Sequence, residues 1–155
     1  MALRRKGQYW YGETPSDVWD YFVQWTRDKP FVDEVTHWKQ AVCPCGNATF
    51  NLFLHEEAGI ALRVCAACGA EYRMLDHPDD ARLRGGEEPD PPEFLCICEC
   101  DEFEVVGVTA PFGPDQPDTA KRFYLGVRCT ECGCLGCCYD FLARYLDYRQ
   151  LLELV

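Results

Sequence analysis

Eight of the chain's twelve cysteines form two copies of one pattern, in which a C-x-C pair is followed by a C-x-x-C pair. The first copy contains Cys43, Cys45, Cys65 and Cys68, and the second contains Cys96, Cys98, Cys129 and Cys132. Two close cysteine pairs separated by the length of a hairpin can supply four thiolates to one tetrahedral ion. Zinc prefers such soft ligands, and a site with all four positions filled is structural. The pattern therefore predicts two structural zinc ions.

The remaining four cysteines lie outside this pattern. Cys100 could replace Cys96 as a ligand by pairing with Cys98, although in that register the two copies match less well. We expect the other three to be surplus apolar thiols buried under the C-terminal segment: Cys134, Cys137 and Cys138. The adjacent last two could instead be redox-active or hold another metal.

The sequence contains no constellation typical of an active site. Its histidines, His37, His55 and His77, do not recur at matching positions in the two copies, so we expect surface or hairpin residues rather than ligands. Zinc-protease, phosphate-binding and nucleotide-binding motifs are missing from the sequence. A filled four-thiolate site also leaves no position for an activated water. We predict that the protein is not an enzyme.

Cysteine chemistry depends on the cellular compartment. The basic residues 1–10 are not followed by an apolar run of signal-peptide length. No stretch approaches the roughly 18 apolar residues of a membrane span. We therefore expect a cytoplasmic protein, in which thiols stay reduced and paired cysteines favour metal over disulfides.

The repeat extends beyond the cysteines. Placing Cys43 on Cys96 also places Phe50 on Phe103. Alternating apolar residues predict strands at 49–55 and 61–64 in the first copy and at 103–108 and 122–128 in the second. The second hairpin is the longer, because it contains a proline-rich insertion at 110–118 that we expect to be a mobile loop or a contact surface.

Each copy resembles a zinc ribbon, over residues 41–76 and 94–140. The second cysteine pairs, Cys65-Ala-Ala-Cys68-Gly69 and Cys129-Thr-Glu-Cys132-Gly133, match the C-x-x-C-G form of that family. The first pairs depart from it, since one residue separates their cysteines. The resemblance implies two cysteine knuckles at hairpin turns that clamp one zinc ion.

Helices are expected on either side of the ribbons. Thr14 as N-cap, Pro15 at the first helical position and Asp17 as capping-box residue predict a helix over 14–28. A second helix is expected over 139–155, and the two could pack together across the ribbons. The predicted class is a small, metal-stabilised α+β fold, divided into an aromatic segment with its helix (1–40), the first ribbon (41–76), an acidic linker (77–93), the second ribbon (94–138) and a C-terminal helix (139–155).

Charge limits the choice of partner. The formal net charge is −11, from 26 acidic and 15 basic residues, and two zinc-thiolate sites would bring it to about −15. So acidic a chain repels nucleic acid unless its basic residues gather on one face. We therefore favour a non-enzymatic protein-binding adaptor, or an inhibitor or immunity-type factor with a basic partner.

Two alternatives stay open. A nucleic-acid-binding regulator would need four arginines, or the terminal 4–6 tract, on one face: Arg63, Arg73, Arg122 and Arg128. A thiol redox switch that releases zinc would use the cysteine cluster at 132–138.

Overall fold

The computed structural model describes residues 3–29, 32–74, 89–143 and 146–155. Its strands are β1 (Arg4–Lys6), β2 (Tyr9–Tyr11), β3 (His37–Gln40), β4 (Phe50–His55), β5 (Ile60–Cys65), β6 (Glu71–Met74), β7 (Glu93–Phe94), β8 (Phe103–Pro111), β9 (Ala120–Cys129) and β10 (Cys134–Leu142). Its helices are α1 (Pro15–Arg27) and α3 (Tyr148–Leu152).

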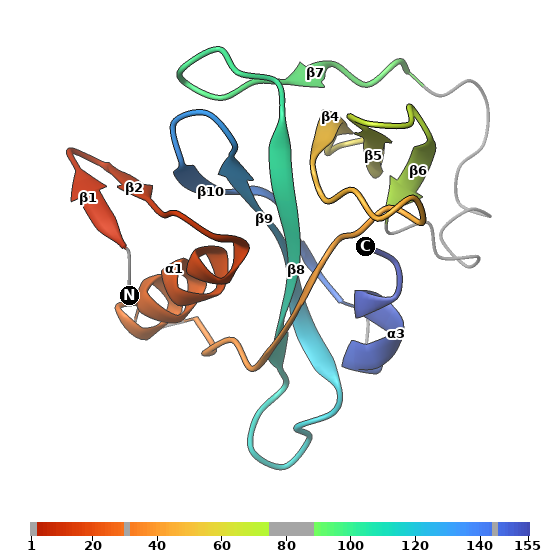
Figure 1. Cartoon of the computed structure of the whole chain (residues 1–155). Coiled ribbons are helices and arrows are strands. Elements are labelled where there is room, and N and C mark those ends of the chain that lie inside the picture. The colour runs from red at the N-terminus through yellow and green to blue at the C-terminus, as the bar shows by residue number, and fades with distance from the viewer. Residues whose placement is uncertain (1–2, 30–31, 75–88, 144–145) are drawn as a thin grey trace.

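The strands make one antiparallel sheet rather than two separate hairpins (Figure 1). The main order is β1-β2-β10-β9-β8-β4-β5-β6, while β3 also pairs with β8 and β7 with β4. The expected α+β class, with two helices flanking two ribbons, is therefore wrong. The described part of the chain is mostly antiparallel sheet, because residues outside the cysteine hairpins also pair as strands.

Each copy of the repeat contributes three consecutive strands in the same register. In the first copy (residues 37–74), β4, β5 and β6 form this unit, and Phe50 pairs with Cys65. In the second copy (residues 93–142), β8, β9 and β10 form it, and Phe103 pairs with Cys129. The predicted hairpin strands are confirmed, and the inserted residues lengthen the β8–β9 hairpin and its turn.

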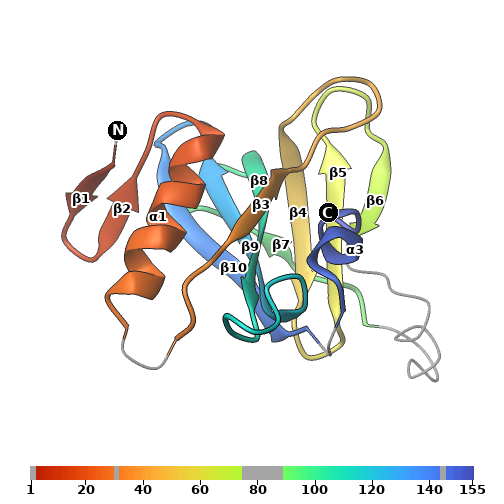
Figure 2. The same cartoon turned by 90° about the horizontal axis from the view of Figure 1, so that it is seen from below.

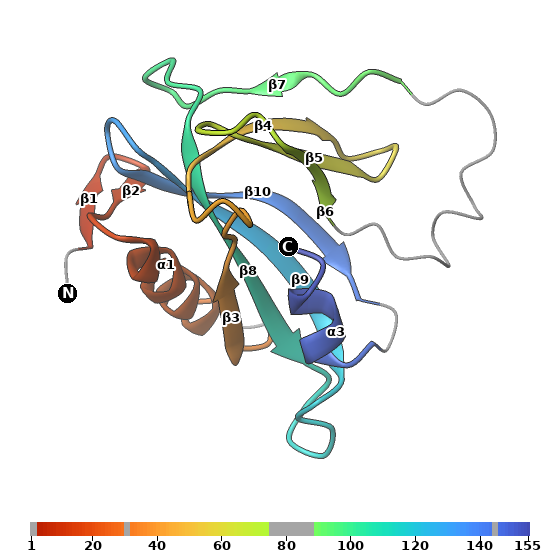
Figure 3. The ribbon, with the colours of Figure 1, turned by 45° about the vertical axis from the view of Figure 1, so that its right-hand side comes forward.

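The two copies meet around a local two-fold relation. The equivalent residues Phe50 and Phe103 pair with each other across β4 and β8. The strand that precedes each first cysteine pair then joins the other copy: Gln40 pairs with Val106, and Glu93 pairs with Phe53. In Figure 3, β3 lies beside β8 and β7 beside β4. Each copy is therefore completed by a strand from the other, as in an exchange between two subunits.

The β8–β9 hairpin is covered on both faces, with α1 on one side and α3 on the other (Figure 2). Two glycines permit this close approach. A Cβ at Gly126 would lie 2.4 Å from Val18 Cγ1 of α1, and one at Gly107 would lie 2.6 Å from Val155 Cγ2. The helices therefore pack on opposite faces of the sheet and not on each other.

The N-terminal helix begins as predicted. Thr14 is the N-cap of α1, Pro15 occupies its first turn, and Asp17 is buried there. The Asp17 carboxylate accepts hydrogen bonds from the backbone N–H groups of Glu13 and Thr14, at 2.7 and 3.0 Å. These contacts satisfy donors that the helix itself leaves unpaired.

The predicted C-terminal helix over 139–155 is wrong in most of its length. Residues up to Leu142 belong to β10, which pairs with β9, and the helix is only the single short α3. Local apolar spacing suggested a helix, but pairing with a distant strand satisfies more backbone groups.

The N-terminal segment and the end of the predicted linker contribute strands as well. The Tyr9–Tyr11 cluster forms β2 and pairs with β10, placing β1–β2 at the edge of the sheet. Of the predicted linker 77–93, residues 77–88 lie outside the described part, and Glu93 begins β7.

Neither helix of the described residues has the length and apolar character that crossing a membrane requires.

Candidate metal centres

The structure brings the eight predicted cysteines into two groups of four. Within each group, every Sγ atom lies within 4.8 Å of the other three. Cys43 and Cys68 Sγ are 3.6 Å apart, and Cys96 and Cys132 Sγ are 3.5 Å apart. Ligands about 2.3 Å from a tetrahedral zinc ion would be about 3.8 Å apart, whereas a disulfide needs about 2.05 Å. Each group therefore fits a metal ion and not a disulfide.

Turns of the same shape present the first cysteine pair of each copy. The N–H of Cys43 donates to Asn47 O, and the N–H of Gly46 donates to Cys43 O. In the second copy, the same two bonds run from Cys96 to Cys100 and from Glu99 to Cys96. The two knuckles therefore share one backbone fold despite their different sequences.

One position in this turn requires a left-handed backbone. Gly46 has φ of 95°, and its counterpart Glu99 has φ of 72°. Among the described residues, Glu99 is the only non-glycine with positive φ. A side chain in this region costs about 1–2 kcal/mol relative to glycine. The second knuckle therefore keeps its shape against a local preference.

The other knuckles both end at a glycine in the left-handed region. Gly69 and Gly133 have φ of 76° and 78°, and their N–H groups donate to the carbonyls of Cys65 and Cys129. In both copies, the glycine of C-x-x-C-G therefore allows the tight turn that follows the second cysteine.

Backbone and side-chain donors surround one sulfur in each group. The N–H of Cys68 donates to Cys65 Sγ at 3.5 Å, and Asn47 Nδ2 donates to it at 3.4 Å. These bonds, the backbone one foremost, favour the thiolate and lower the pKa of Cys65 to about 6. Backbone donation from Cys100 likewise lowers the pKa of Cys98.

A second sulfur in each group resists ionisation. The backbone N–H of Cys45 favours the Cys43 thiolate, but burial and neighbouring thiols outweigh it and raise its pKa to about 12. Burial also raises the pKa of Cys96. Four adjacent thiolates repel one another, and a bound divalent cation would remove that conflict by displacing their protons.

Both groups lie at the rim of the sheet, half in and half out of the core. Cys43, Cys65 and Cys129 are buried, whereas Cys45, Cys68 and Cys98 are exposed. A metal held there would join a core strand to an outer turn in each copy.

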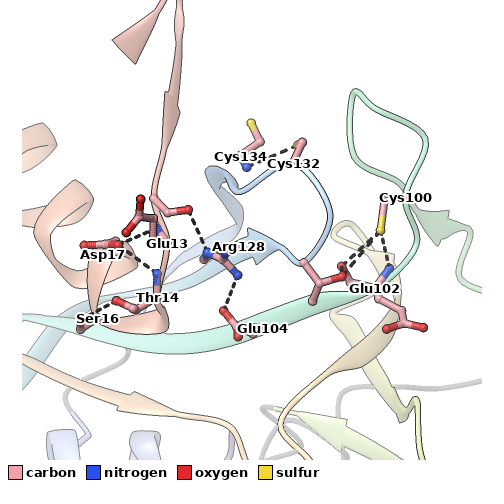
Figure 4. Close-up of polar contacts among 12 residues, drawn as sticks. Glu13, Thr14, Ser16, Asp17, Cys100, Glu102, Glu104, Arg128, Cys132 and Cys134 are labelled. Atoms are coloured by element: carbon pink, nitrogen blue, oxygen red, sulfur yellow. Dashed lines mark hydrogen bonds and ion pairs between the residues drawn. The ribbon is translucent and has the colours of Figure 1, made fainter. Parts of the chain in front are cut away.

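Cys100 is not part of the second group. It occupies the place that Asn47 has in the first copy, and its Sγ lies 3.8 Å from the Thr130 hydroxyl and accepts from the Glu102 N–H at 3.5 Å (Figure 4). The structure therefore groups Cys96, and not Cys100, with the other three predicted ligands.

The remaining thiols lie on β10 rather than under a C-terminal helix, which corrects their expected setting. The backbone N–H of Cys134 donates to the ligand-group sulfur of Cys132 at 3.4 Å (Figure 4). The Cys138 thiol donates to Leu125 O, and burial raises its pKa. The Cys137 thiol is exposed and donates to Tyr139 O at 3.4 Å. Thiols that keep their protons are poor nucleophiles.

Arg128 fastens the N-terminal segment to the second copy. Its Nε donates to Gly12 O at 2.9 Å and its Nη1 pairs with Glu104 at 3.0 Å (Figure 4). The Gly12 N–H also donates to Gly133 O of the knuckle at 2.9 Å. The loop that leads into α1 is therefore held against the second cysteine group.

The two described histidines lie apart from both cysteine groups. The His37 ring stacks on Tyr148 with centroids 3.6 Å apart, and His55 Nδ1 accepts from the Ala58 N–H. His77 lies outside the described residues. Neither His37 nor His55 belongs to either group of four cysteines.

An open apolar cavity of about 440 Å³ adjoins the second cysteine group. It lies between the β1–β2 hairpin, the segment before Cys98 and the strands β9 and β10; its walls include Tyr9, Trp10, Phe94, Leu95, Ile97 and Phe103. Leu95 and Ile97, on either side of Cys96, are 51% and 55% exposed. Sequence reasoning missed this surface, although two apolar residues around a ligand cysteine were a signal.

Comparison with family models, with curated proteins and with solved structures found no match to this chain. The metal-site geometry therefore stands on the residues of this chain alone.

Proposed function

We propose that each cysteine group binds one zinc ion through four thiolates, with no coordination position left for a substrate. The matched backbone turns, the sulfur spacing and the donors to sulfur support this assignment. Zinc is the metal that this ligand set and a closed tetrahedral site favour most. Bound there, it would supply folding free energy and no redox chemistry.

We further propose that the protein is a non-enzymatic cytoplasmic binding protein whose partner is another protein. One observation carries this proposal: the cavity and the exposed Leu95 and Ile97 make an apolar surface beside the second metal centre. Exposed apolar groups gathered around a hollow are typical of protein interfaces. The net charge of −11 favours a basic partner by electrostatic attraction.

The nucleic-acid alternative receives less support. Arg63 is buried, while Arg128 and Arg122 form ion pairs with Glu104 and Asp140. Arg63 and Arg128 therefore offer little to a phosphate backbone, whereas Arg122 is only half-buried and the strand Arg4–Lys6 is exposed. The redox alternative is weakened at Cys138, because burial raises the pKa of this thiol.

The repeat provides a matched test of the binding surface. Leu95→Ser with Ile97→Ser would remove the apolar surface of the second copy. The control is Val42→Ser with Pro44→Ser, at the equivalent positions around Cys43. Both are solvent-facing, so zinc content should stay unchanged. We expect proteins captured from native cell extract, identified by mass spectrometry, to be lost with the first pair and retained with the second. Equal capture by both would contradict the proposal.

A further inference from the structure

The cavity of the second copy has a filled counterpart in the first. On β5 and β6, Arg63 pairs with Tyr72, and the equivalent pair on β9 and β10 is Val127 with Gly136. The first copy has the long cationic side chain of Arg63 beside the ring of Tyr72. At the same two positions, the second copy has the short side chain of Val127 and a glycine without a side chain. Both Val127 and Gly136 line the cavity, and a Cβ at Gly136 would meet no atom within 4 Å. The space therefore exists because two side chains are missing.

In the first copy, the side chain of Arg63 occupies the position that corresponds to the cavity. Its guanidinium carbon lies 4.6 Å from the Phe50 ring centroid and 4.4 Å from that of Tyr72, so two rings enclose it. Arg63 is only 5% exposed, and its Nε has no hydrogen-bond partner among the described residues. Two aromatic faces thus surround a buried cation whose Nε makes no hydrogen bond within the described part of the chain.

The second copy retains one of these two rings, since Gly136 stands where the first copy has Tyr72. Phe103 stands in the place of Phe50 and contacts Phe94, with ring centroids 5.0 Å apart. Further aromatic side chains line the cavity from the N-terminal segment: Tyr9, Trp10 and Tyr21. The ring of Trp10 already accepts one guanidinium, that of Arg5, 5.6 Å from its centroid. Cys96 brings the second metal group to the cavity wall.

We propose that this cavity receives the guanidinium of an arginine from the partner protein, in the position that Arg63 occupies in the first copy. The inference rests on the proposed protein-binding function and names its chemistry: a basic segment with one exposed arginine. Aromatic faces attract the cation, and a zinc ion bound by four thiolates carries net negative charge beside it. Burial of the arginine stem would cover the apolar wall.

Direct titration tests the assignment on the full zinc-loaded chain. The probes are four short peptides of glycine and serine that differ only at a central residue: arginine, citrulline, norleucine or trimethyllysine. Binding is followed through the NMR signal of the Trp10 indole N–H. Citrulline has the shape of arginine without its charge, and we expect it to bind at least about tenfold more weakly, which corresponds to about 1.4 kcal/mol.

Transplanting the first copy's residues provides the second arm. Val127→Arg with Gly136→Tyr should fill the cavity from within and abolish arginine-peptide binding, while Val127→Ile should retain it. Citrulline or norleucine binding as tightly as arginine would overturn the assignment, and so would tighter binding of trimethyllysine or undiminished binding to the filled variant. If the filled variant does not fold, the peptide series alone decides.

The two proposals fail differently. Loss of captured protein on changing Leu95 and Ile97, together with equal binding of all four peptides, would leave protein binding standing and remove the arginine. Arginine-specific binding with no effect of Leu95 and Ile97 on capture would contradict the proposed interface instead.

Discussion

The two copies of the repeat have the same cysteine geometry and differ in what surrounds it. In the first, Arg63 and Tyr72 fill the space beside the sulfur group. In the second, the same positions are Val127 and Gly136, and the space is open. The second copy is also the one that α1 and the β1–β2 hairpin cover. Under the proposed function, the first copy mainly supports the fold and the second presents the binding surface.

The strand exchange links these two roles. β3 leads into the first knuckle yet pairs with β8, and β7 leads into the second yet pairs with β4. A change at either metal centre should therefore destabilise both copies, although the proposed binding surface lies beside the second.

Loss of one metal centre should have the largest effect. Cys65→Ser and Cys129→Ser each remove one thiolate, and a structural zinc site supplies about 10–16 kcal/mol of apparent binding free energy, comparable to the stability of a whole domain. Because of the exchanged strands, we expect either variant to lose amide-exchange protection in both copies. Native protection of the second copy in Cys65→Ser would show instead that the copies are independent.

A single added methyl group at Gly126 should disrupt the packing of α1 on the second copy. Gly126→Ala would place a methyl group 2.4 Å from Val18 Cγ1 and 2.5 Å from Phe22, and should cost about 1–3 kcal/mol in the free energy of unfolding. Gly136→Ala is the matched control, since its methyl group meets nothing within 4 Å. Chemical denaturation of zinc-loaded protein measures both. A similar cost for the two variants would argue against the tight helix–sheet contact.

The first cysteine knuckles of the two copies differ at the residue with a left-handed backbone, which is Gly46 in one and Glu99 in the other. Substitutions at these two positions should change the free energy of unfolding by small amounts of opposite sign. Glu99→Gly should stabilise the protein by about 1 kcal/mol, whereas Gly46→Ala should destabilise it by a similar amount. Denaturation midpoints with zinc bound provide the measurement. If both variants were destabilising, a contact of the Glu99 side chain would have to outweigh the backbone preference.

The smallest predicted effect is a loss of stability at alkaline pH that is due to Tyr124, whose equivalent in the first copy does not titrate. Tyr124 packs against α1, where the first copy has Ile60, and burial raises its pKa to about 12. Tyr124 holds its proton more tightly in the folded than in the unfolded protein. The free energy of unfolding should therefore fall as the pH rises from about 10 to about 12. Tyr124→Phe should flatten this decline in thermal unfolding measured across that range. An identical decline in the variant would contradict the assignment.

How much of this the sequence could predict depends on the range of the interactions. Capping residues at Thr14 and Asp17 act locally, and the helix they predicted is present. The cysteine hairpins were predictable because one pattern occurs twice, with Phe50 on Phe103. Placing Cys65 on Cys129 instead, a shift of 64 residues, places residues 71–74 on 135–138. That second overlay could also have revealed that β6 and β10 are equivalent third strands.

Features that depend on distant partners could not be predicted in this way. The C-terminal segment has helical spacing, but β9 was available to pair with it. The short strands β3 and β7 are too short to show a periodicity, and their partners lie in the opposite copy. The cavity appears only when Val127 and Gly136 are compared with Arg63 and Tyr72 in register.

Native mass spectrometry of the freshly purified, reduced chain tests the central claim most directly. We predict two zinc ions for each folded chain, one fewer when either Cys65 or Cys129 is replaced. A folded chain that carries no metal would contradict the account.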